Sequence, residues 1–390
     1  MKTRSTDPPQ LSIDGARLLA RLRQLGDTGR NAPGQLTRLA ASHEDKLGRD
    51  LLVSWLRAAG LEVTVDAIGN IFGSWGADIE KPALMIGSHI DTVVDAGIYD
   101  GCYGVLAALA VIGALKTQAT NPDRPVILAA FTNEEGVRYQ PDMMGSLVYA
   151  GGYDLDAALS AIGSDGTVLG QELKRIGYAG ASTPRFPRPA MYLELHIEQG
   201  PILEREGCTI GAVQDLQGIS WQRVTINGAA NHAGTTPIAL RRDAGLAAAR
   251  VITFLRDSVI AGQTTVATVG TIRFEPDAIN IIPSRAVFTI DLRDPDEQRL
   301  QSAEHKLTQF LKQLEQQENV TIEIERIVRF EPVIFDQELV QRIEQTVERR
   351  GLKYRRMTSG AGHDAQMMAR ICPAAMIFVP SHNGISHNPL

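Results

Sequence analysis

The chain has 390 residues, of which 44% are hydrophobic and 22% charged, and its formal net charge is −6. At roughly 150 residues per domain, this length suggests two to three domains with a sizeable core. The acidic balance excludes the basic stripe of a nucleic-acid-binding protein. Three widely spaced cysteines form no disulfide framework, which favours the cytoplasm. The N-terminus lacks the apolar segment of a signal peptide, and the longest apolar run, residues 105–115, is too short to span a membrane.

Helices and strands alternate along the first half of the chain. In chain order, the patterns predict helices over 11–25 and 46–59, strands over 62–66, 70–73 and 83–88, a helix over 101–116, and strands over 125–132 and 191–198. The strand over 125–132 contains the continuous apolar run VILAAF, which is typical of a strand covered on both faces. This alternation predicts an α/β sheet with helices on both faces.

The pattern changes near Gln214. From there the predicted order is βαββαβ, with elements over 220–227, 239–258, 265–274, 285–293, 296–317 and 320–328. This is the order of a small, ferredoxin-like α+β sandwich. The chain then returns to α/β character, with a helix over 337–350, a glycine-rich turn over 359–362 and a strand over 374–379. We therefore expect one α/β domain over 1–213 and 330–390, interrupted by an inserted α+β domain over 214–329.

Histidines and carboxylates concentrate in four segments. These are GSHIDTVVDAGIYDG (87–101), TNEEG (132–136), ELHIEQG (194–200) and GISHNP (384–389). Each segment lies at the end of a predicted strand or follows one. In open α/β sheets, ligands bind outside the carboxyl ends of the strands. The four segments are therefore expected to converge on one crevice.

The residue types in these segments suit a divalent metal site, because imidazole and carboxylate are typical ligands of Zn²⁺ and related ions. His89 ends a strand, and Asp91 could hold its other ring nitrogen. Asp100 precedes a helix and could bridge two ions. On the strand over 191–198, His196 lies opposite the apolar positions, as a ligand would.

The remaining candidates leave alternatives open. Glu134 and Glu135 are adjacent, so in extended backbone one can bind metal while the other faces an attacking water. An isolated Glu-Glu or His-x-Asp pair is more often structural than functional. His387 could also be an ordinary loop histidine, and His382 is its rival. Only the joint occurrence of the four segments indicates a metal site.

The sequence resembles the N-carbamoyl-L-amino acid hydrolase and allantoate amidohydrolase branch of the M20-type dinuclear metallohydrolases. The motifs that carry the resemblance run in the family order along nearly the whole chain. They are GSHIDTV (87–93), YDGCYG (99–104), TNEEG (132–136), ELHIEQGP (194–201), NHAGTTP (231–237), RRDA (241–244), SGAGHDAQ (359–366) and NGISHNP (383–389). The family continues with another helix beyond the point where Leu390 ends this sequence.

The resemblance implies two divalent ions per chain. One would be held by His89, Asp100 and His196, and the other by Asp100, Glu135 and His387. Zn²⁺ is the first choice, and Mn²⁺, Co²⁺ and Ni²⁺ accept the same ligands. The expected catalytic residues are Glu134 as general base, Asp91 as support of the site, and His232 as donor to the oxyanion.

The resemblance also implies substrate contacts. His232, Asn280 and Arg293 match contacts on the inserted domain, which would serve as a lid and as the contact of a homodimer. Gln199, Gly360 and Gly362 match contacts on the catalytic side. An arginine fork suits a substrate carboxylate, but Arg293 could instead be a surface residue paired with Asp291 or Asp294.

These expectations rank four functions. The first is hydrolysis of a linear N-carbamoyl-L-amino acid, and the second is the same chemistry on allantoate or another ureide. The third is a peptidase or deacylase, which His196 disfavours because related peptidases tend to have a carboxylate there. The fourth is a non-catalytic binding protein, against which the intact Glu134 and the five intact candidate ligands argue.

Overall fold

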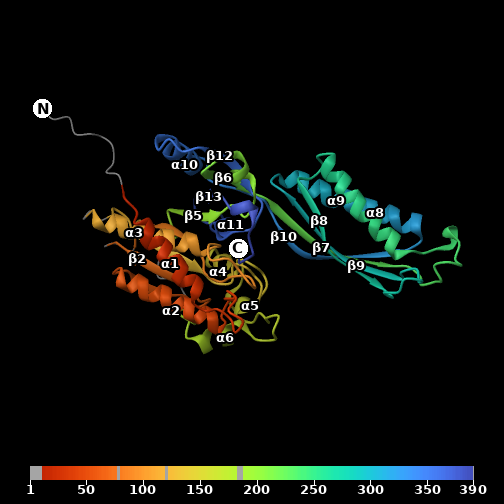
Figure 1. The fold of residues 1–390 in the computed structure, drawn as a ribbon, viewed down its shortest axis with the longest axis horizontal. Helices are drawn as coiled ribbons and strands as arrows, with labels where there is room; N and C mark the ends of the chain where they lie inside the picture. The colour runs from red at the N-terminus through yellow and green to blue at the C-terminus, as the bar shows by residue number, and fades with distance from the viewer. Residues whose placement is uncertain (1–10, 77–79, 119–121, 182–187, 390) are drawn as a thin grey trace. The chain divides into compact units, whose positions relative to one another are not determined.

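The computed structural model describes residues 11–389 except 77–79, 119–121 and 182–187. The expectation about a signal peptide concerns residues 1–15, of which residues 1–10 lie outside the described residues. The chain forms two compact units, and Figure 1 labels many of their helices and strands along the ribbon. The first contains the described residues up to Gln214, Phe335–Met357 and those from Ala361 onwards. The second contains Asp215–Ile334 and Thr358–Gly360.

The main sheet has the strand order β1–β2–β4–β3–β5–β13–β6–β11, and β12 also pairs with β6. Its strands are β1 Glu62–Val65, β2 Ile71–Trp75, β3 Leu84–His89, β4 Val126–Phe131, β5 Met191–Ile197, β6 Ile210–Leu216, β11 Val333–Ile334, β12 Tyr354–Ser359 and β13 Ala374–Val379. The strands β4, β3, β5 and β13 are mutually parallel neighbours, so their carboxyl ends share one edge. This arrangement confirms the predicted α/β sheet.

The helices of the first unit are α1 Gly15–Asp27, α2 His43–Ala58, α3 Cys102–Thr117, α4 Met144–Tyr149, α5 Leu155–Leu159, α6 Leu169–Ile176, α7 Ile202–Glu206, α10 Gln337–Arg349 and α11 Asp364–Met368. Of these, α2, α3, α4, α10 and α11 contact strands of the sheet. The helix α3 contacts β3, β4 and β5, and α11 contacts β3, β5 and β13. The strand β4 is buried at every position, as its apolar run predicts. Among the described helices, none is both long and apolar enough to cross a bilayer.

The second unit has a four-stranded antiparallel sheet with the order β10–β7–β9–β8. Its elements are β7 Gly218–Asn227, α8 Ala244–Ile260, β8 Val266–Glu275, β9 Arg285–Asp294, α9 Glu297–Glu318 and β10 Thr321–Phe330. The rings of Phe254 on α8 and Phe310 on α9 stack at 4.2 Å between centroids. This is the predicted βαββαβ order.

The helix α8 begins later than its periodicity predicts. We expected a start at Ala239, but α8 begins at Ala244, because Ile238–Leu240 forms a separate 3-10 turn. The Asp243 side chain then accepts hydrogen bonds from the main-chain N–H groups of Gly245 and Leu246, which fixes the true helix start. The sequence patterns also gave no prediction for β6, β11 or β12.

A buried arginine ties α2 to the sheet edge that carries TNEEG. The Arg49 side chain is 1% exposed and donates to Asp45 Oδ2 at 2.7 Å, within the same helix. It also donates to the Gly69 carbonyl at 2.6 Å and to Thr132 Oγ1 at 3.2 Å. Because Thr132 opens the TNEEG segment, this one guanidinium helps to position the end of β4.

We expect Arg49→Met to lower the free energy of unfolding by about 3–5 kcal/mol, because it leaves the buried Asp45 carboxylate without its cation. The matched control is Lys46→Met, which removes the exposed Lys46–Asp50 pair from the same helix and should cost less than about 1 kcal/mol. Urea unfolding of both variants measures the difference. Equal losses would show that burial does not govern the contribution of the Arg49 pair.

Candidate metal centre

The structure brings side chains of all four segments together at the carboxyl edge of β3, β4, β5 and β13. Ligand atoms of His89, Asp100 and His196 lie within 4.8 Å of one another, and so do those of Asp100, Glu135 and His387. These are the same two groups that the resemblance implies. Their convergence follows from the parallel strands, because residues that follow each strand reach a common edge.

Hydrogen bonds orient two of the histidines toward Asp100. Nδ1 of His89 lies 2.9 Å from the Asp91 carbonyl oxygen, and Nδ1 of His196 lies 2.9 Å from the Ile197 carbonyl oxygen. A carbonyl only accepts, so each Nδ1 carries a hydrogen, and in the neutral imidazole each Nε2 then keeps its lone pair. These Nε2 atoms lie 3.8 and 3.1 Å from Asp100 Oδ1. Lone pairs that face a carboxylate repel it unless a cation lies between them, so this group of residues fits a divalent ion.

The approach of these groups depends on Gly101. Its φ is +61°, and a Cβ atom there would collide with the His89 ring. The Gly101 main-chain N–H also points to His196 Nε2 at 3.2 Å. Glycine at this position therefore lets the start of α3 bring Asp100 against both imidazoles.

Burial and charge determine the protonation of this group. Burial lowers the pKa of His89 to about 4, so its imidazole is neutral at pH 7. Burial alone would lower the pKa of His196, but the charge of Asp100 outweighs it and the pKa is raised. Burial likewise favours the neutral form of Asp100, but the neighbouring His196 outweighs it and the pKa of Asp100 is lowered. Asp100 is therefore available as an ionised, potentially bridging carboxylate.

Asp91 makes a different contact from the one expected. Its carboxylate lies 3.9 Å from His89 Nδ1 and instead accepts hydrogen bonds from the main-chain N–H groups of Glu134 and Glu135, both at 3.2 Å. The Asp91 main-chain carbonyl is the group that binds His89. Burial raises the pKa of Asp91 to about 7. Asp91 thus supports His89 through its backbone and the Glu134–Glu135 backbone through its side chain.

Glu134 and Glu135 point toward different groups of ligands, as their adjacency suggests. Glu134 Oε2 lies 3.4 Å from His89 Nε2, and Glu135 Oε2 lies 3.6 Å from His387 Nε2. Burial raises the pKa of both carboxyls well above the usual value, and the next contributions are the charges of Asp364 for Glu134 and Asp100 for Glu135. A raised pKa suits a general base, and a cation nearby would favour the ionised form.

The structure separates the two rival histidines. His387 Nε2 lies 3.7 Å from Asp100 Oδ2, and the side chain is 49% exposed. His382 is 86% exposed, and its Nδ1 lies 3.1 Å from Glu204 Oε1, outside both groups of candidate ligands. Gln199, expected to contact substrate, has its side-chain nitrogen 3.0 Å from Asp100 Oδ2.

A buried network behind His196 was not found from the sequence. Glu194 is fully buried and accepts hydrogen bonds from Ser88 Oγ at 2.7 Å and from the Ala365 main-chain N–H at 2.8 Å. The His363 ring lies 4.4 Å from the His196 ring, and ligand atoms of Glu194, His196 and His363 also lie within 4.8 Å of one another. Strand periodicity could have indicated Glu194, which lies two residues before His196 on the same face. The face of β5 that carries Glu194 and His196 is buried, whereas the apolar residues on the opposite face of the strand are half-buried.

The other expected substrate contacts lie mainly in the second unit. His232 forms an isolated bridge with Ile281, and the Ala233 N–H donates to the Asn280 carbonyl at 2.9 Å, so the His232 and Asn280 loops are adjacent. The exposed His232 side chain accepts from the Gly234 N–H at 3.1 Å.

Arg293 has partners within the second unit. Its fork donates to the Asp291 carboxylate at 2.8–3.1 Å, which is the ion pair that the sequence left as an alternative, and Nη1 donates to the Gly360 carbonyl at 2.6 Å. An arginine has five N–H donors, so this pairing does not use them all. Gly362 belongs to the first unit, where a Cβ atom would come within 3.0–3.2 Å of Met143.

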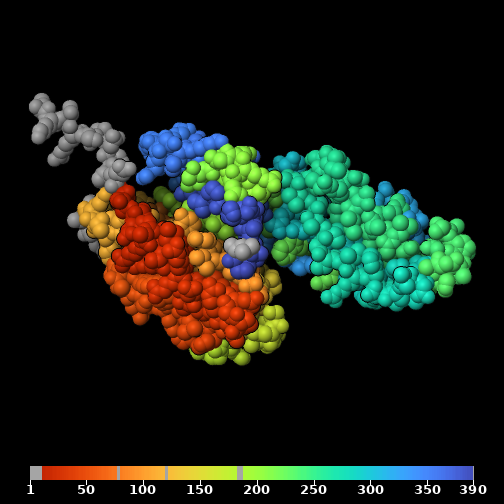
Figure 2. All heavy atoms as spheres, in the orientation of Figure 1, coloured from red at the N-terminus to blue at the C-terminus, as the bar shows by residue number. Residues whose placement is uncertain are grey.

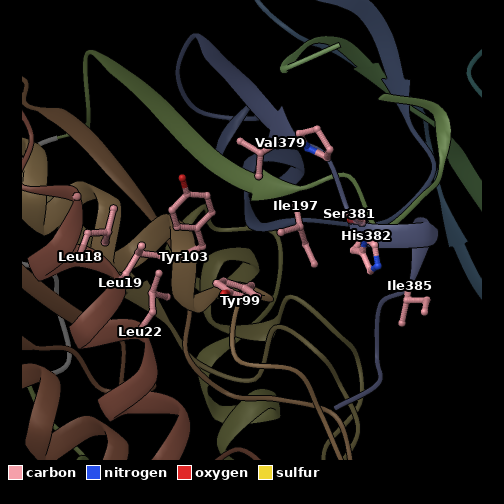
Figure 3. A pocket seen from close by; sticks show the side chains of 12 residues that line it. Leu18, Leu19, Leu22, Tyr99, Tyr103, Ile197, Val379, Ser381, His382 and Ile385 are labelled. Carbon is pink, nitrogen blue, oxygen red and sulfur yellow. The ribbon is translucent and has the colours of Figure 1, made fainter. Parts of the chain in front are cut away.

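A separate cavity of about 570 Å³ is lined by residues next in sequence to some of the candidate ligands (Figure 3). Apolar side chains of α1, including Leu18 and Leu22, line it together with Tyr99, Tyr103 and Ile197. Tyr99 and Ile197 are the chain neighbours of Asp100 and His196, but no residue of the two ligand groups lines the cavity, whereas the rival histidine His382 does. Its lining is apolar, so it is not the place for the polar chemistry of the two ligand groups.

Comparisons with known proteins place this geometry in a family. Residues 85–390 match the model of peptidase family M20/M25/M40. The chain is 36% identical to N-carbamoyl-L-amino acid amidohydrolase of Geobacillus stearothermophilus, over 97% of this chain and 93% of the relative. It is 37% identical to allantoate amidohydrolase of Escherichia coli strain K12, over 94% of this chain and 90% of the relative.

A solved structure gives the same assignment. The crystal structure of an amidase of the hydantoinase/carbamoylase family from Burkholderia multivorans superposes with a TM-score of 0.91 and 40% identity, over 98% of this chain and 93% of that chain. The family and the buried His/Asp/Glu groups together indicate a metal site. The chain belongs to the M20 family, in its hydantoinase/carbamoylase branch, and is an amidohydrolase that acts on carbon–nitrogen bonds other than peptide bonds.

Proposed function

We propose that the protein hydrolyses N-carbamoyl-L-amino acids and uses two divalent ions, with Zn²⁺ as the first choice and Mn²⁺, Co²⁺ or Ni²⁺ as alternatives. The observation that carries this proposal is the pair of ligand groups that share Asp100, with the Glu134 carboxylate beside them. His89 and His196 would hold one ion, and Glu135 and His387 the other. The relative from Geobacillus stearothermophilus supports the substrate.

The bound ions would polarise the substrate carbonyl and bring the pKa of a water to roughly 7. The protein's own contribution begins with Glu134, whose carboxylate takes a proton from the attacking water and gives it to the leaving nitrogen. Asp91 keeps Glu134 in place by accepting two main-chain hydrogen bonds. His232 donates a hydrogen bond to the former carbonyl oxygen, which becomes an oxyanion when the water adds to the carbonyl carbon.

The substrate's carboxylate needs a cationic partner. Arg293 can supply a fork of N–H donors, and Asp291 and the Gly360 carbonyl hold that fork in a defined direction. Asn280 lies on the loop next to His232 and would contact the same substrate. On the side of the ligand groups, Gln199 and the backbone at Gly362 complete the proposed substrate contacts.

Allantoate is the second candidate substrate. It also combines ureide groups with a carboxylate, so the same base and the same arginine would serve it. The specific support is the allantoate amidohydrolase of Escherichia coli, whose identity to this chain is as high as that of the carbamoylase. A peptide substrate is disfavoured because His196 lies where related peptidases tend to have a carboxylate.

A substrate panel tests this proposal. The metal-loaded enzyme should hydrolyse N-carbamoyl-L-amino acids faster, by kcat/KM, than allantoate, β-ureidopropionate or dipeptides. Arg293→Lys should reduce kcat/KM strongly for substrates with a carboxylate and weakly for their amide analogues, because lysine lacks the bidentate fork. Equal losses on both would mean that Arg293 is structural. Preference for allantoate would select the second candidate.

Two neighbouring variants separate the proposed base from the proposed ligand. Glu134→Gln should keep both ions and lose at least about 10²-fold in kcat, because the amide cannot take the proton. Glu135→Gln should weaken the binding of one ion. Elemental analysis after dialysis gives the metal content, and steady-state kinetics give kcat. The assignment fails if both variants lose metal equally.

We also propose that the protein is a homodimer that pairs through its second unit, the surface coloured green to blue in Figure 2. The strand β8 lies at an edge of its sheet, where its N–H and C=O groups can pair with another strand. Apolar side chains are exposed on β8 and on the helix that packs against it: Val266, Ile272 and Phe274 on β8, and Leu246, Ile252 and Ile260 on α8.

Mixed dimers test whether each active site uses His232 of the partner subunit. Glu134→Ala and His232→Ala chains would be dissociated, mixed and reassociated. If His232 acts across the interface, each mixed dimer has one complete site, and about a quarter of all sites become active with random pairing. If mixed dimers form and activity stays at the level of the two parents, His232 acts within its own chain.

A further inference from the structure

The side-chain amide of Gln199 contacts two atoms that belong to the second group of candidate ligands. Its Nε2 lies 3.0 Å from Asp100 Oδ2 and 3.2 Å from His387 Nε2. The main chain holds Gln199 in place, since its φ is +57° and its N–H donates to Ser381 Oγ at 2.9 Å. An amide NH₂ has two hydrogens, so it can donate to both acceptors at once.

These hydrogen bonds use electron pairs that a cation needs. Asp100 Oδ2 and His387 Nε2 lie 3.7 Å apart, and Glu135 Oε2 lies 3.6 Å from the same His387 nitrogen. His387 Nε2 has a single lone pair, which cannot accept an N–H hydrogen and bind a divalent ion at the same time, whereas Asp100 Oδ2 keeps a second lone pair. The Gln199 amide and an ion at Asp100, Glu135 and His387 are therefore mutually exclusive occupants of the same position.

The Gln199 amide satisfies only part of the hydrogen-bonding capacity of Asp100, Glu135 and His387. Glu135 Oε1 and Gln199 Oε1 are both buried, and neither has a hydrogen-bond partner in the described part of the chain. A neutral NH₂ group offers only a partial positive charge, whereas three ligand side chains, two of them carboxylates, attract a full cation. The Gln199 amide is therefore a weak substitute for an ion at this position, and a divalent cation can displace it.

We propose that Gln199 sets the affinity of the ion held by Asp100, Glu135 and His387, because its NH₂ group must leave the ligand lone pairs before that ion binds. This inference rests on the proposed two-ion function and assigns Gln199 a role in metal binding in addition to its proposed contact with substrate. In the other group, the amide meets the shared Asp100 at Oδ2, whereas His89 and His196 face Oδ1 and have no hydrogen bond with a side-chain amide in the described part of the chain. We therefore expect the ion of this group to be independent of Gln199.

Calorimetric titration of the chelator-treated enzyme with Mn²⁺ measures this effect without using activity. His387→Ala should retain one ion, and the binding step that it loses identifies the second site. Gln199→Leu keeps the side-chain volume and removes both donors, so it should tighten that step about tenfold and leave the other step unchanged. The matched control is Gln171→Leu, at an exposed position of α6, which should bind as the wild type does.

The outcomes separate the alternatives. Weaker binding in Gln199→Leu would mean that Gln199 is itself a ligand through Oε1, and unchanged binding would mean that the amide does not compete; either result overturns the proposal. Gln199→Met, which also lacks both donors and adds no charge, should likewise tighten the second step, and it serves if Gln199→Leu does not fold. In a His387→Ala background, Gln199→Leu should have no effect. A wild-type enzyme that binds no ion would overturn the proposed function itself.

Discussion

The buried carboxylate of Asp100 is the constraint on which the site depends. A buried charge costs several kcal/mol unless it is paired, and here the partners are the Nε2 atoms of three histidines, which bring positive charge only when they are protonated or hold a cation. Both imidazoles on the sheet side, His89 and His196, are held in this orientation by carbonyl groups of the backbone. The protein therefore retains an arrangement that is unfavourable by itself and becomes favourable when positive charge is present, which is typical of sites where function outweighs stability.

The sequence predicted the architecture because its strongest signals are local. The apolar run of β4 and the alternation of β9 specify strands without reference to the rest of the chain. The convergence of the four segments was predictable for a topological reason, since residues that follow parallel strands meet at one edge. The boundary of α8 was wrong because the Asp243 cap, not the hydrophobic periodicity, determines where that helix begins.

The parts of the site that the sequence could not supply are contacts between distant residues or contacts made by the backbone. Glu194 binds the Ala365 N–H across 171 positions, so no local pattern joins them. Asp91 was expected to hold His89 by its side chain, but the chain turns so that its carbonyl does this and its carboxylate meets Glu134 and Glu135. No residue pattern distinguishes these two arrangements, because both have the same spacing.

The pairing of β7 with β10 has a consequence for how such a chain can evolve. Ile219, near the start of the inserted segment, is paired with Phe330 near its end, so the segment enters and leaves at neighbouring positions. When the two ends of an insertion lie side by side, the insertion places little strain on the surrounding sheet, and the length of the inserted segment has little effect on this. Helices and loops of the second unit can therefore be lengthened, exchanged or reshaped, and new specificities can arise there while the strands that carry the histidines and carboxylates stay unchanged.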